Sequence, residues 1–202
     1  MMARAAGPKS ASGRPKVGVV IGTTRESRFG DKPARWIFEL AAERTDVEPE
    51  IVDLRDYPLP FFDEPVAPLI APPANVIAQR WCRKLASLDG FVFITAEYNH
   101  GISGALKNAL DHAYPELNRK PAAFVGYGGL GGARAVEQLR LVCIELQMAP
   151  TRSSVHITRE PIAAVRAGKR FADFPFLEEA ATEMLDDLSW WTHALRAARD
   201  AS

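Results

Sequence analysis

A polar loop between residues 22 and 30 carries the first candidate chemistry of this sequence. It follows an apolar run and precedes a helical pattern, and it supplies hydroxyl and guanidinium groups from Thr23, Thr24, Arg25, Ser27 and Arg28. Unpaired N–H groups at a helix N-terminus attract anions, and an arginine can hold two phosphate oxygens at once. We therefore predict a site for a terminal phosphate, with a plain polar turn as the alternative. The absence of GxxxxGK[ST] excludes a nucleoside triphosphatase loop.

A second polar loop follows the most apolar run of the chain, residues 91–95, and reads Glu97-Tyr98-Asn99-His100-Gly101. Tyrosine offers a flat face for stacking, and exposed peptide groups can bind the polar edge of a heteroaromatic ring. A flavin needs both kinds of contact. The alternative is a tyrosine that packs against a neighbour. His100 has no patterned acidic or cysteine partner, so we expect it to be neither a metal ligand nor a catalytic base.

A third loop, residues 126–132, contains five glycines in seven positions. Glycine allows positive φ angles and lets the backbone approach a ligand closely. The string matches GxGxxG, but a dinucleotide site needs an acidic residue about 20 positions later, and residues 149–153 contain none. We therefore favour a loop that opens against a planar ring or a pyrophosphate. A flexible turn is the alternative.

The elements around these loops alternate between strands and helices. Strands are expected at 17–21, 50–54, 91–95, 121–127 and 154–157, and helices from about 31, 77, 103, 133 and 177. Such alternation indicates a doubly wound α/β fold with a five-stranded parallel sheet. Gly90 is expected to end the second helix in a left-handed conformation. Residues 56–73 and 158–176 are expected to be loops.

Composition limits the class of function. The 202 residues carry 25 basic and 25 acidic side chains, a net charge of zero, which argues against nucleic-acid or membrane-surface binding. No apolar run approaches the roughly 20 residues that span a bilayer. Cys82 and Cys143 are expected to be buried free thiols, which favours the cytoplasm. Residues 1–15 are expected to be a disordered tail, and residues 16–202 a single domain.

Three stretches together, residues 22–36, 95–113 and 125–140, resemble the NADPH-dependent FMN reductase family. The resemblance implies a flavodoxin-like, FMN-binding domain with strand order 2-1-3-4-5. It assigns the FMN phosphate to Thr23, Arg25, Arg28 and the backbone near Gly30. It places Glu97, Tyr98 and Asn99 along the isoalloxazine, and it assigns the other side of the ring to Gly128, Gly129, Gly131 and Gly132. The sequence departs from the pattern of the family at two positions. Arg28 stands where many members have serine, and Ala96 stands where many have proline.

The resemblance further implies an oxidoreductase that needs no metal and no catalytic side chain. NADPH, or NADH, would reduce FMN, and the flavin would pass two electrons to a flavin, quinone, azo compound or metal oxyanion. Members are commonly homodimers or dimers of dimers. Residues 57–62 and the start of the second helix are candidates for that contact, and Lys107, Asn108 and Asp111 are expected to fix it and the nearby loop. The alternatives are a flavodoxin-type electron carrier without nicotinamide activity and a non-enzymatic domain of the same fold.

Overall fold

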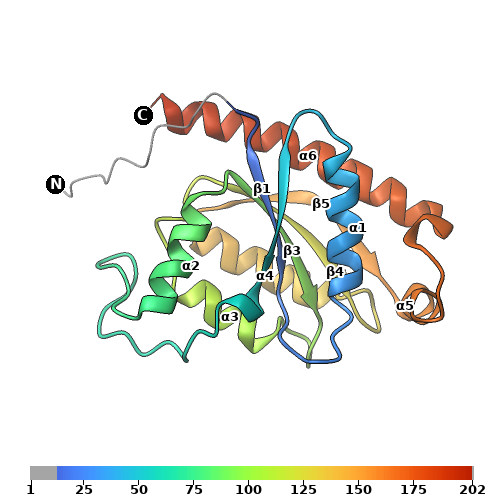
Figure 1. Ribbon diagram of the computed structural model, residues 1–202, viewed down its shortest axis with the longest axis horizontal. Helices are drawn as coiled ribbons and strands as arrows, with labels where there is room; N and C mark the ends of the chain where they lie inside the picture. Colours follow the sequence, from blue (N-terminus) through green and yellow to red (C-terminus); the bar gives the residue numbers. More distant parts are fainter. Residues whose placement is uncertain (1–12, 202) are drawn as a thin grey trace.

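The computed structural model describes residues 13–201 and has a five-stranded parallel sheet at its centre (Figure 1). The strands are β1 (Lys16–Ile21), β2 (Glu48–Asp53), β3 (Gly90–Ala96), β4 (Pro121–Tyr127) and β5 (Ala149–Ile157). Their order, β2-β1-β3-β4-β5, confirms the prediction. The order reverses between β1 and β3, and ligands of such sheets bind beyond the carboxyl ends of the strands at that place.

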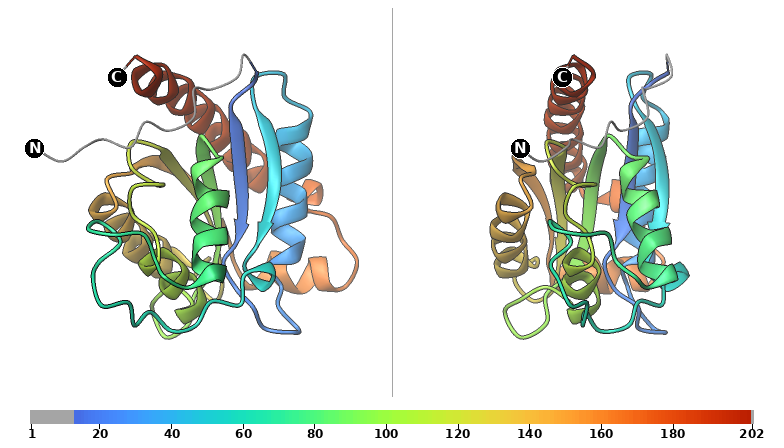
Figure 2. Two further views of the ribbon diagram at one scale, coloured as in Figure 1. Left: turned by 60° about the vertical axis from the view of Figure 1, so that its left-hand side comes forward. Right: turned by 90° about the vertical axis from the view of Figure 1, so that its left-hand side faces the viewer.

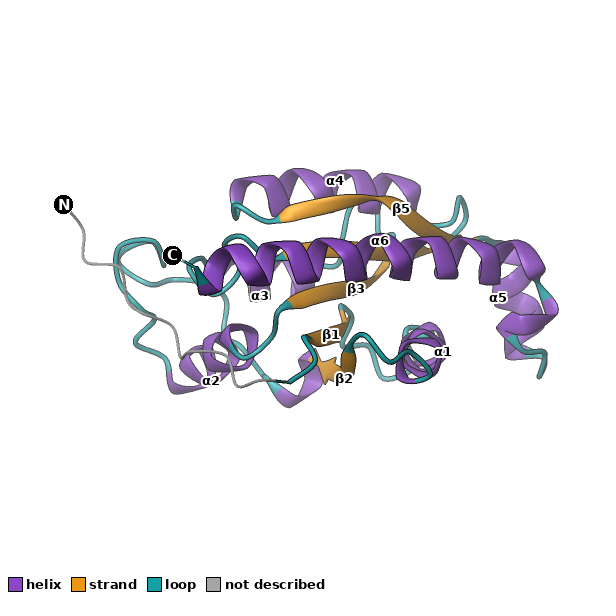
Figure 3. Ribbon diagram, turned by 90° about the horizontal axis from the view of Figure 1, so that it is seen from above, coloured by secondary structure: helices purple, strands orange, loops and turns teal. Residues whose placement is uncertain are grey.

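Helices cover both faces of the sheet, as the strands between helices in Figure 3 show. One face packs against α1 (Asp31–Ala42) and α6 (Pro175–Asp200), and the other against α2 (Val76–Ala86), α3 (Gly104–Asp111) and α4 (Ala133–Glu145). Both central strands, β3 and β4, are buried along their whole length. Burial on two faces explains why their sequences are continuously apolar rather than alternating.

Side-chain caps and buried hydrogen bonds set the ends of the helices beside the site. Ser103 accepts a hydrogen bond from the N–H of Leu106 at 3.0 Å, which confirms it as the cap of α3. The fully buried indole of Trp81 on α2 donates to the carbonyl of Ala109 on α3 at 2.7 Å. These contacts fix α3, and with it the loop that follows β3.

Gly90 has a different role from the one expected. The second helix ends at Ala86, and Gly90 begins β3 without a positive φ angle. A Cβ atom at Gly90 would lie 2.7 Å from the hydroxyl oxygen of Thr192 on α6. Glycine is needed here because α6 packs closely on the sheet, so the prediction of a left-handed cap was wrong.

The region expected to be a loop between 158 and 176 contains a helix, α5 (Arg159–Arg166), and a 3₁₀ turn, Phe171–Asp173. Pro161 and Val165 of α5 are buried. The ring of Phe171 stacks on Trp36 of α1 with centroids 4.6 Å apart. This packing holds α5 at the carboxyl edge of the sheet, beside the start of α1 (Figure 2). The sequence pattern missed α5 because only about two turns are present.

Two smaller expectations concern the chain's ends and its cysteines. The predicted tail falls mainly on residues 1–12, which lie outside the described residues. Within the described part, Pro15 is buried and its carbonyl accepts a hydrogen bond from Glu48 at 2.8 Å. Cys82 and Cys143 are buried and unpaired, as expected. Among residues 13–201 there is no helix long and apolar enough to cross a membrane.

Candidate functional site

The three loops singled out from the sequence meet at the carboxyl edge of the sheet. They border one cavity of about 640 Å³, to which they contribute Arg25, Arg28, Glu97, Tyr98, Tyr127 and Gly128. This volume lies within the range of about 300–1,000 Å³ that is usual for small-molecule sites. The topology therefore brings together residues that are about 30 and 70 positions apart in the sequence.

The loop between β1 and α1 offers a row of N–H groups. Those of Thr24, Arg25, Glu26 and Ser27 donate to no protein group within residues 13–201. The loop is closed instead by one hydrogen bond, from the N–H of Arg28 to the carbonyl of Arg25 at 3.2 Å. Unpaired N–H groups that precede a helix form an anion-binding site, because the helix dipole adds positive potential there.

Arg55, directly after β2, orients this row of N–H groups. Its guanidinium donates to the carbonyls of Arg25, Glu26 and Thr24, the latter two at 3.0 and 3.4 Å. A trans peptide directs its N–H opposite to its carbonyl. The N–H groups of residues 25, 26 and 27 therefore face away from Arg55. Arg55 lines a smaller cavity of about 360 Å³. The N–H groups of residues 25, 26 and 27 therefore face away from this smaller cavity too.

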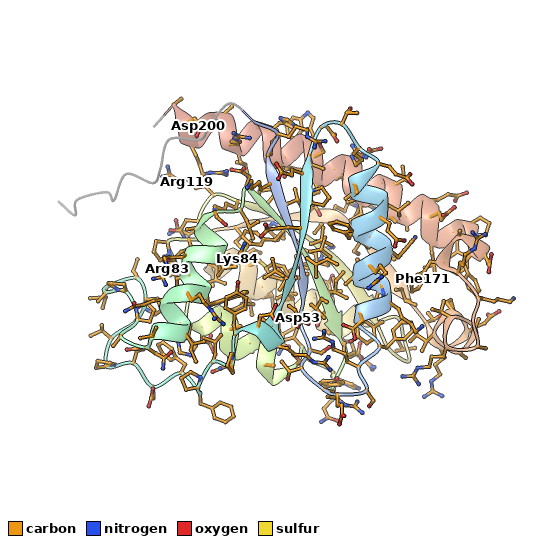
Figure 4. The ribbon with its side chains drawn as sticks, viewed as in Figure 1. Asp53, Arg83, Lys84, Arg119, Phe171 and Asp200 are labelled. Atoms are coloured by element: carbon orange, nitrogen blue, oxygen red, sulfur yellow. The ribbon has the colours of Figure 1, made fainter. Side chains whose placement is uncertain are left out.

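Arg28 braces the loop from inside. Its side chain is 2% exposed and bonds Asp53, Asp31 and the carbonyl of Thr23, which together occupy all five guanidinium N–H groups. Asp53 lies at the lower edge of the sheet beside this loop (Figure 4). Burial is the largest single influence and would raise the pKa of Asp53, but the hydrogen bonds from Arg28 and from the N–H of Arg55, together with the charges of both arginines, outweigh it and the pKa is lowered. This geometry makes Arg28 a support of the loop, which differs from the direct phosphate contact implied by the resemblance.

Thr23 and Gly30 form the floor of the loop with a residue that sequence reasoning missed, Tyr127. Thr23 is 1% exposed, and its hydroxyl lies 3.3 Å from the Tyr127 hydroxyl. A Cβ atom at Gly30 would lie 3.0 Å from that same tyrosine oxygen. Burial raises the pKa of Tyr127, which keeps its hydroxyl protonated. Tyr127 lies within the glycine loop singled out from the sequence, but its position at the end of an apolar strand gave no sign that its hydroxyl meets the first loop.

Arg25 is the exposed cation of this loop. Its guanidinium lies 5.9 Å from the centroid of the Tyr98 ring, and it forms no ion pair among the described residues. The two side chains thus link the loops after β1 and β3 across the cavity. A guanidinium that has no carboxylate partner is available to an anionic ligand.

The loop after β3 is a tight hairpin. Tyr98 and Gly101 exchange two backbone hydrogen bonds of 2.9 and 3.0 Å, while Asn99 and His100 have φ angles of 49° and 68°. Positive φ at both central positions is typical of a type I′ turn. Asn99 and His100 are exposed at its tip. The described residues contain no group of three or more His, Cys, Asp or Glu that could hold a metal ion.

Glu97 joins the β3 loop to the glycine loop. Its carboxylate, 6% exposed, accepts from Arg134 Nε at 2.6 Å and from the N–H of Arg134 at the start of α4 at 3.2 Å. Burial alone would raise the pKa of Glu97, but the contacts with Arg134 outweigh it and the pKa is lowered. The carboxylate is therefore charged and fixed, and it positions the two loops relative to each other.

The four glycines predicted to line the site divide into two pairs. Gly128 borders the cavity, and Gly129 is exposed next to it. Gly131 and Gly132 are buried with φ angles of 68° and 72°. A Cβ atom at Gly132 would lie 2.6 Å from the N atom of Tyr127. The second pair therefore shapes the turn, and the first pair faces the ligand space.

Residues 15–161 match the model of the NADPH-dependent FMN reductase family. The chain belongs to this family. An NAD(P)H-dependent FMN reductase of Schizosaccharomyces pombe is 40% identical over 154 residues, which are 73% of this chain and 76% of that protein. A quinone reductase of Pseudomonas putida is 31% identical over 147 residues, 66% of this chain and 75% of that protein.

A solved structure shares the fold of this FMN reductase family member. The flavoenzyme NAD(P)H:acceptor oxidoreductase FerB of Paracoccus denitrificans superposes with a TM-score of 0.65 at 24% identity, covering 86% of this chain and 97% of that one. This likeness confirms the predicted flavodoxin-like fold. The family model and the relatives confirm the predicted family and oxidoreductase class.

The FMN reductase family match ends inside α5, and the site contains further residues from this part of the chain. Ile162 and Arg166 of α5 line the 640 Å³ cavity, together with Phe29 and Lys32 at the start of α1. None of the four was predicted. Phe29 and Lys32 lie within residues 22–36, where the sequence indicated an anion-binding loop but did not single out these two side chains. Ile162 and Arg166 gave no signal, because α5 itself was not recognised.

Of the three residues of α3 expected to fix the long loop of this FMN reductase family member, Asn108 does so, whereas Lys107 and Asp111 form no hydrogen bond with it within residues 13–201. Asn108 donates to the carbonyl of Pro60 at 2.8 Å and accepts from the N–H of Phe62 at 2.9 Å. Lys107 and Asp111 pair with each other at 2.6 Å along the same helix. Asn108 thus holds residues 60–62 against α3, beside the smaller cavity of about 360 Å³ that it lines.

Proposed function

We propose that this chain binds FMN in the 640 Å³ cavity and oxidises a reduced nicotinamide through it. The observation that carries the proposal is the row of unpaired N–H groups at residues 24–27, directly before α1 and beside the unpaired guanidinium of Arg25. This combination suits a dianionic terminal phosphate. The cavity that opens next to it is large enough for a tricyclic ring. The residues present therefore fit FMN.

Each loop has a distinct part in holding the cofactor. The N–H groups of residues 24–27 and Arg25 hold the phosphate, and Thr23 and Gly30 keep the floor of the loop compact. Tyr98, Asn99 and Gly128 border the ring, and Glu97, Gly131 and Gly132 fix the loops that carry them. Gly129 keeps the neighbouring space open for the nicotinamide. Arg28 supports the loop from beneath.

The reaction depends on binding and orientation rather than on acid–base side chains. Bound FMN supplies the redox chemistry, accepting a hydride from the nicotinamide and passing two electrons to an acceptor. The charge of Glu97 is engaged by Arg134, and the Tyr127 hydroxyl lies against Thr23. Both groups are held by these contacts, so we assign them to positioning the loops that would hold FMN rather than to proton transfer.

The acceptor is a small molecule that uses the same open face as the nicotinamide, with a quinone as the first candidate. One relative is a quinone reductase, and another is an FMN reductase, which supports quinones and free flavins as acceptors. If both substrates use the same face in turn, the enzyme should follow ping-pong kinetics, in which the nicotinamide leaves before the acceptor binds. Parallel lines in double-reciprocal plots would support this, whereas a required ternary complex would contradict it.

The assembly is a homodimer or a dimer of dimers in the cytoplasm. Exposed apolar side chains on and beside the long loop support a contact there: Phe61 is 88% exposed, Ile70 69% and Val76 73%. Two buried free thiols suit a reducing compartment. Light scattering of the eluting protein tests the assembly, and a monomer at micromolar concentration would contradict it.

Anaerobic titration with NADPH tests the function. Purified protein should be yellow, should release FMN on denaturation, and should bleach when NADPH is added. Yellow protein that bleaches with dithionite but with neither nicotinamide would instead be an electron carrier. Colourless protein that takes up no added FMN would contradict both functions.

A further inference from the structure

Four cations at the site have no carboxylate partner. Arg25 and Lys32 come from the first loop and α1, and Arg159 and Arg166 come from α5. None of them forms an ion pair within residues 13–201, although the chain as a whole has a net charge of zero. The other cation of the cavity wall, Arg28, is balanced by Asp31 and Asp53. The site therefore has an excess of positive charge that one FMN phosphate does not use up.

Packing of α5 sets the position of two of these cations. Pro161 and Val165 bury one side of the helix, while Arg159 and Arg166 are exposed on the other. The Arg166 guanidinium lies 5.7 Å from the centroid of the Phe29 ring and lines the cavity. The helix is thus anchored on the core, with Arg166 at the cavity and both arginines exposed on the opposite side of the helix.

Arg159 lies over the glycine loop. Its Nε atom is 3.6 Å from the position that a Cβ atom of Gly129 would occupy, and its Nη2 atom is 3.8 Å from it. Gly129 is the exposed glycine next to the cavity. Arg166 therefore lines the cavity at Phe29, and Arg159 lies over Gly129, the neighbour of the lining residue Gly128. The unpaired N–H groups lie apart from both arginines, in the loop after β1.

We propose that Arg159 and Arg166 form a second phosphate subsite, which binds the 2′-phosphate of NADPH and makes NADPH the preferred donor over NADH. The inference rests on the proposed function, since it needs a nicotinamide to bind beside FMN. A terminal phosphate is the group that guanidinium forks bind best, through paired, charge-assisted hydrogen bonds. The 2′-phosphate is also the one group by which NADPH differs from NADH.

The test uses the FMN-loaded protein and three variants. Arg159→Gln and Arg166→Gln remove the proposed contacts while keeping a polar side chain of similar length. Arg83→Gln is the matched control, because Arg83 is exposed on α2, far from α5 (Figure 4). Two measurements are made on each protein. They are the KM for NADPH and for NADH, and the calorimetric Kd for 2′,5′-ADP and for 5′-AMP.

Each α5 variant should raise the KM for NADPH and the Kd for 2′,5′-ADP by roughly 10- to 100-fold, the usual effect of losing hydrogen bonds to a charged group. The values for NADH and 5′-AMP should stay within about twofold, as should all values for the control. Unchanged melting temperatures should accompany these results, because both arginines are exposed.

Three results would overturn the inference. Equal losses for NADPH and NADH would place the arginines at the pyrophosphate, and loss of FMN from the Arg166 variant would place that arginine at the FMN phosphate. A wild-type protein with equal affinity for 2′,5′-ADP and 5′-AMP would remove the subsite altogether. Failure of the proposed function has another signature, a wild-type protein that neither retains FMN nor oxidises either nicotinamide.

Discussion

Replacing Arg55 should weaken FMN binding without weakening the fold. Arg55 is exposed and its side chain donates only to the carbonyls of Thr24, Arg25 and Glu26, so Arg55→Gln removes the restraint on these three peptide groups. Hydrogen bonds from an exposed side chain add little to stability, and we expect a loss of about 0.5–1 kcal/mol in the free energy of unfolding.

The expected loss of affinity follows from the number of residues that Arg55 holds. Fixing the backbone of one residue costs about 1–2 kcal/mol, so a loop freed over three residues could lose up to about 3–6 kcal/mol of binding free energy. The Arg28 N–H to Arg25 carbonyl bond and the buried floor at Thr23 keep part of the loop in place. We therefore expect a loss of about 1.5–3 kcal/mol, or roughly 10- to 100-fold in Kd.

Fluorescence titration of the apoprotein with FMN measures this Kd, and thermal unfolding without FMN measures stability. Arg55→Lys should recover part of the affinity, because an ammonium group can still bind one of the three carbonyls. An Arg55→Gln protein with wild-type affinity would refute the reasoning that Arg55 orients the N–H groups. A large drop in melting temperature together with the loss of affinity would also refute it, because the role would then be structural.

Three further predictions concern other parts of the fold. Gly30→Ala should lower the free energy of unfolding by about 1–3 kcal/mol, because the new Cβ would crowd the Tyr127 hydroxyl at 3.0 Å; urea unfolding that matches wild type would contradict this. Asp53→Asn should lower the free energy of unfolding by about 1–2 kcal/mol at pH 7. This loss is smaller than that expected on breaking a fully buried ion pair, because Arg28 still pairs with Asp31 and because Asp53 is 22% exposed. Because folding lowers the pKa of Asp53, the difference in the free energy of unfolding between wild type and Asp53→Asn should be constant above about pH 4.5 and shrink below it. Burial lowers the pKa of Lys120 to about 7. Between about pH 7 and 10 the unfolded chain therefore binds a proton that the folded chain does not, and the stability of wild type should rise relative to that of Lys120→Met. Curves of unfolding free energy against pH that run parallel for the two proteins would contradict this.

The sheet and its loops were predictable because they depend on local patterns. Runs of β-branched and aromatic residues marked the strands, with β4 correct at both ends. The parallel order then required that the loops after β1, β3 and β4 share one edge. The residue types in these loops were therefore enough to indicate where the site lies.

Residues that act through long-range contacts were not predictable in this way. Arg55 reached the first loop from across the sheet edge, and Arg28 found Asp53 at a separation of 25 residues. Gly90 looked like a helix cap but is required by α6, which lies about 100 positions later in the chain. In each case the partner is chosen by tertiary packing, which a local pattern does not contain.

The helix α5 combines both difficulties. Its eight residues include Pro161, and only two of its side chains are buried. Its position depends on the aromatic contact of Phe171 with Trp36. A short helix of this kind is stabilised by what it packs on rather than by its own sequence.

The ratio of the dissociation constants for riboflavin and FMN tests the central claim most directly. The two ligands share the ring and the ribityl chain and differ only in the phosphate. If the N–H groups of residues 24–27 and Arg25 seat that phosphate, wild-type apoprotein should bind FMN at least about 100-fold more tightly than riboflavin. Equal affinities would show that no phosphate occupies this loop and would contradict the account.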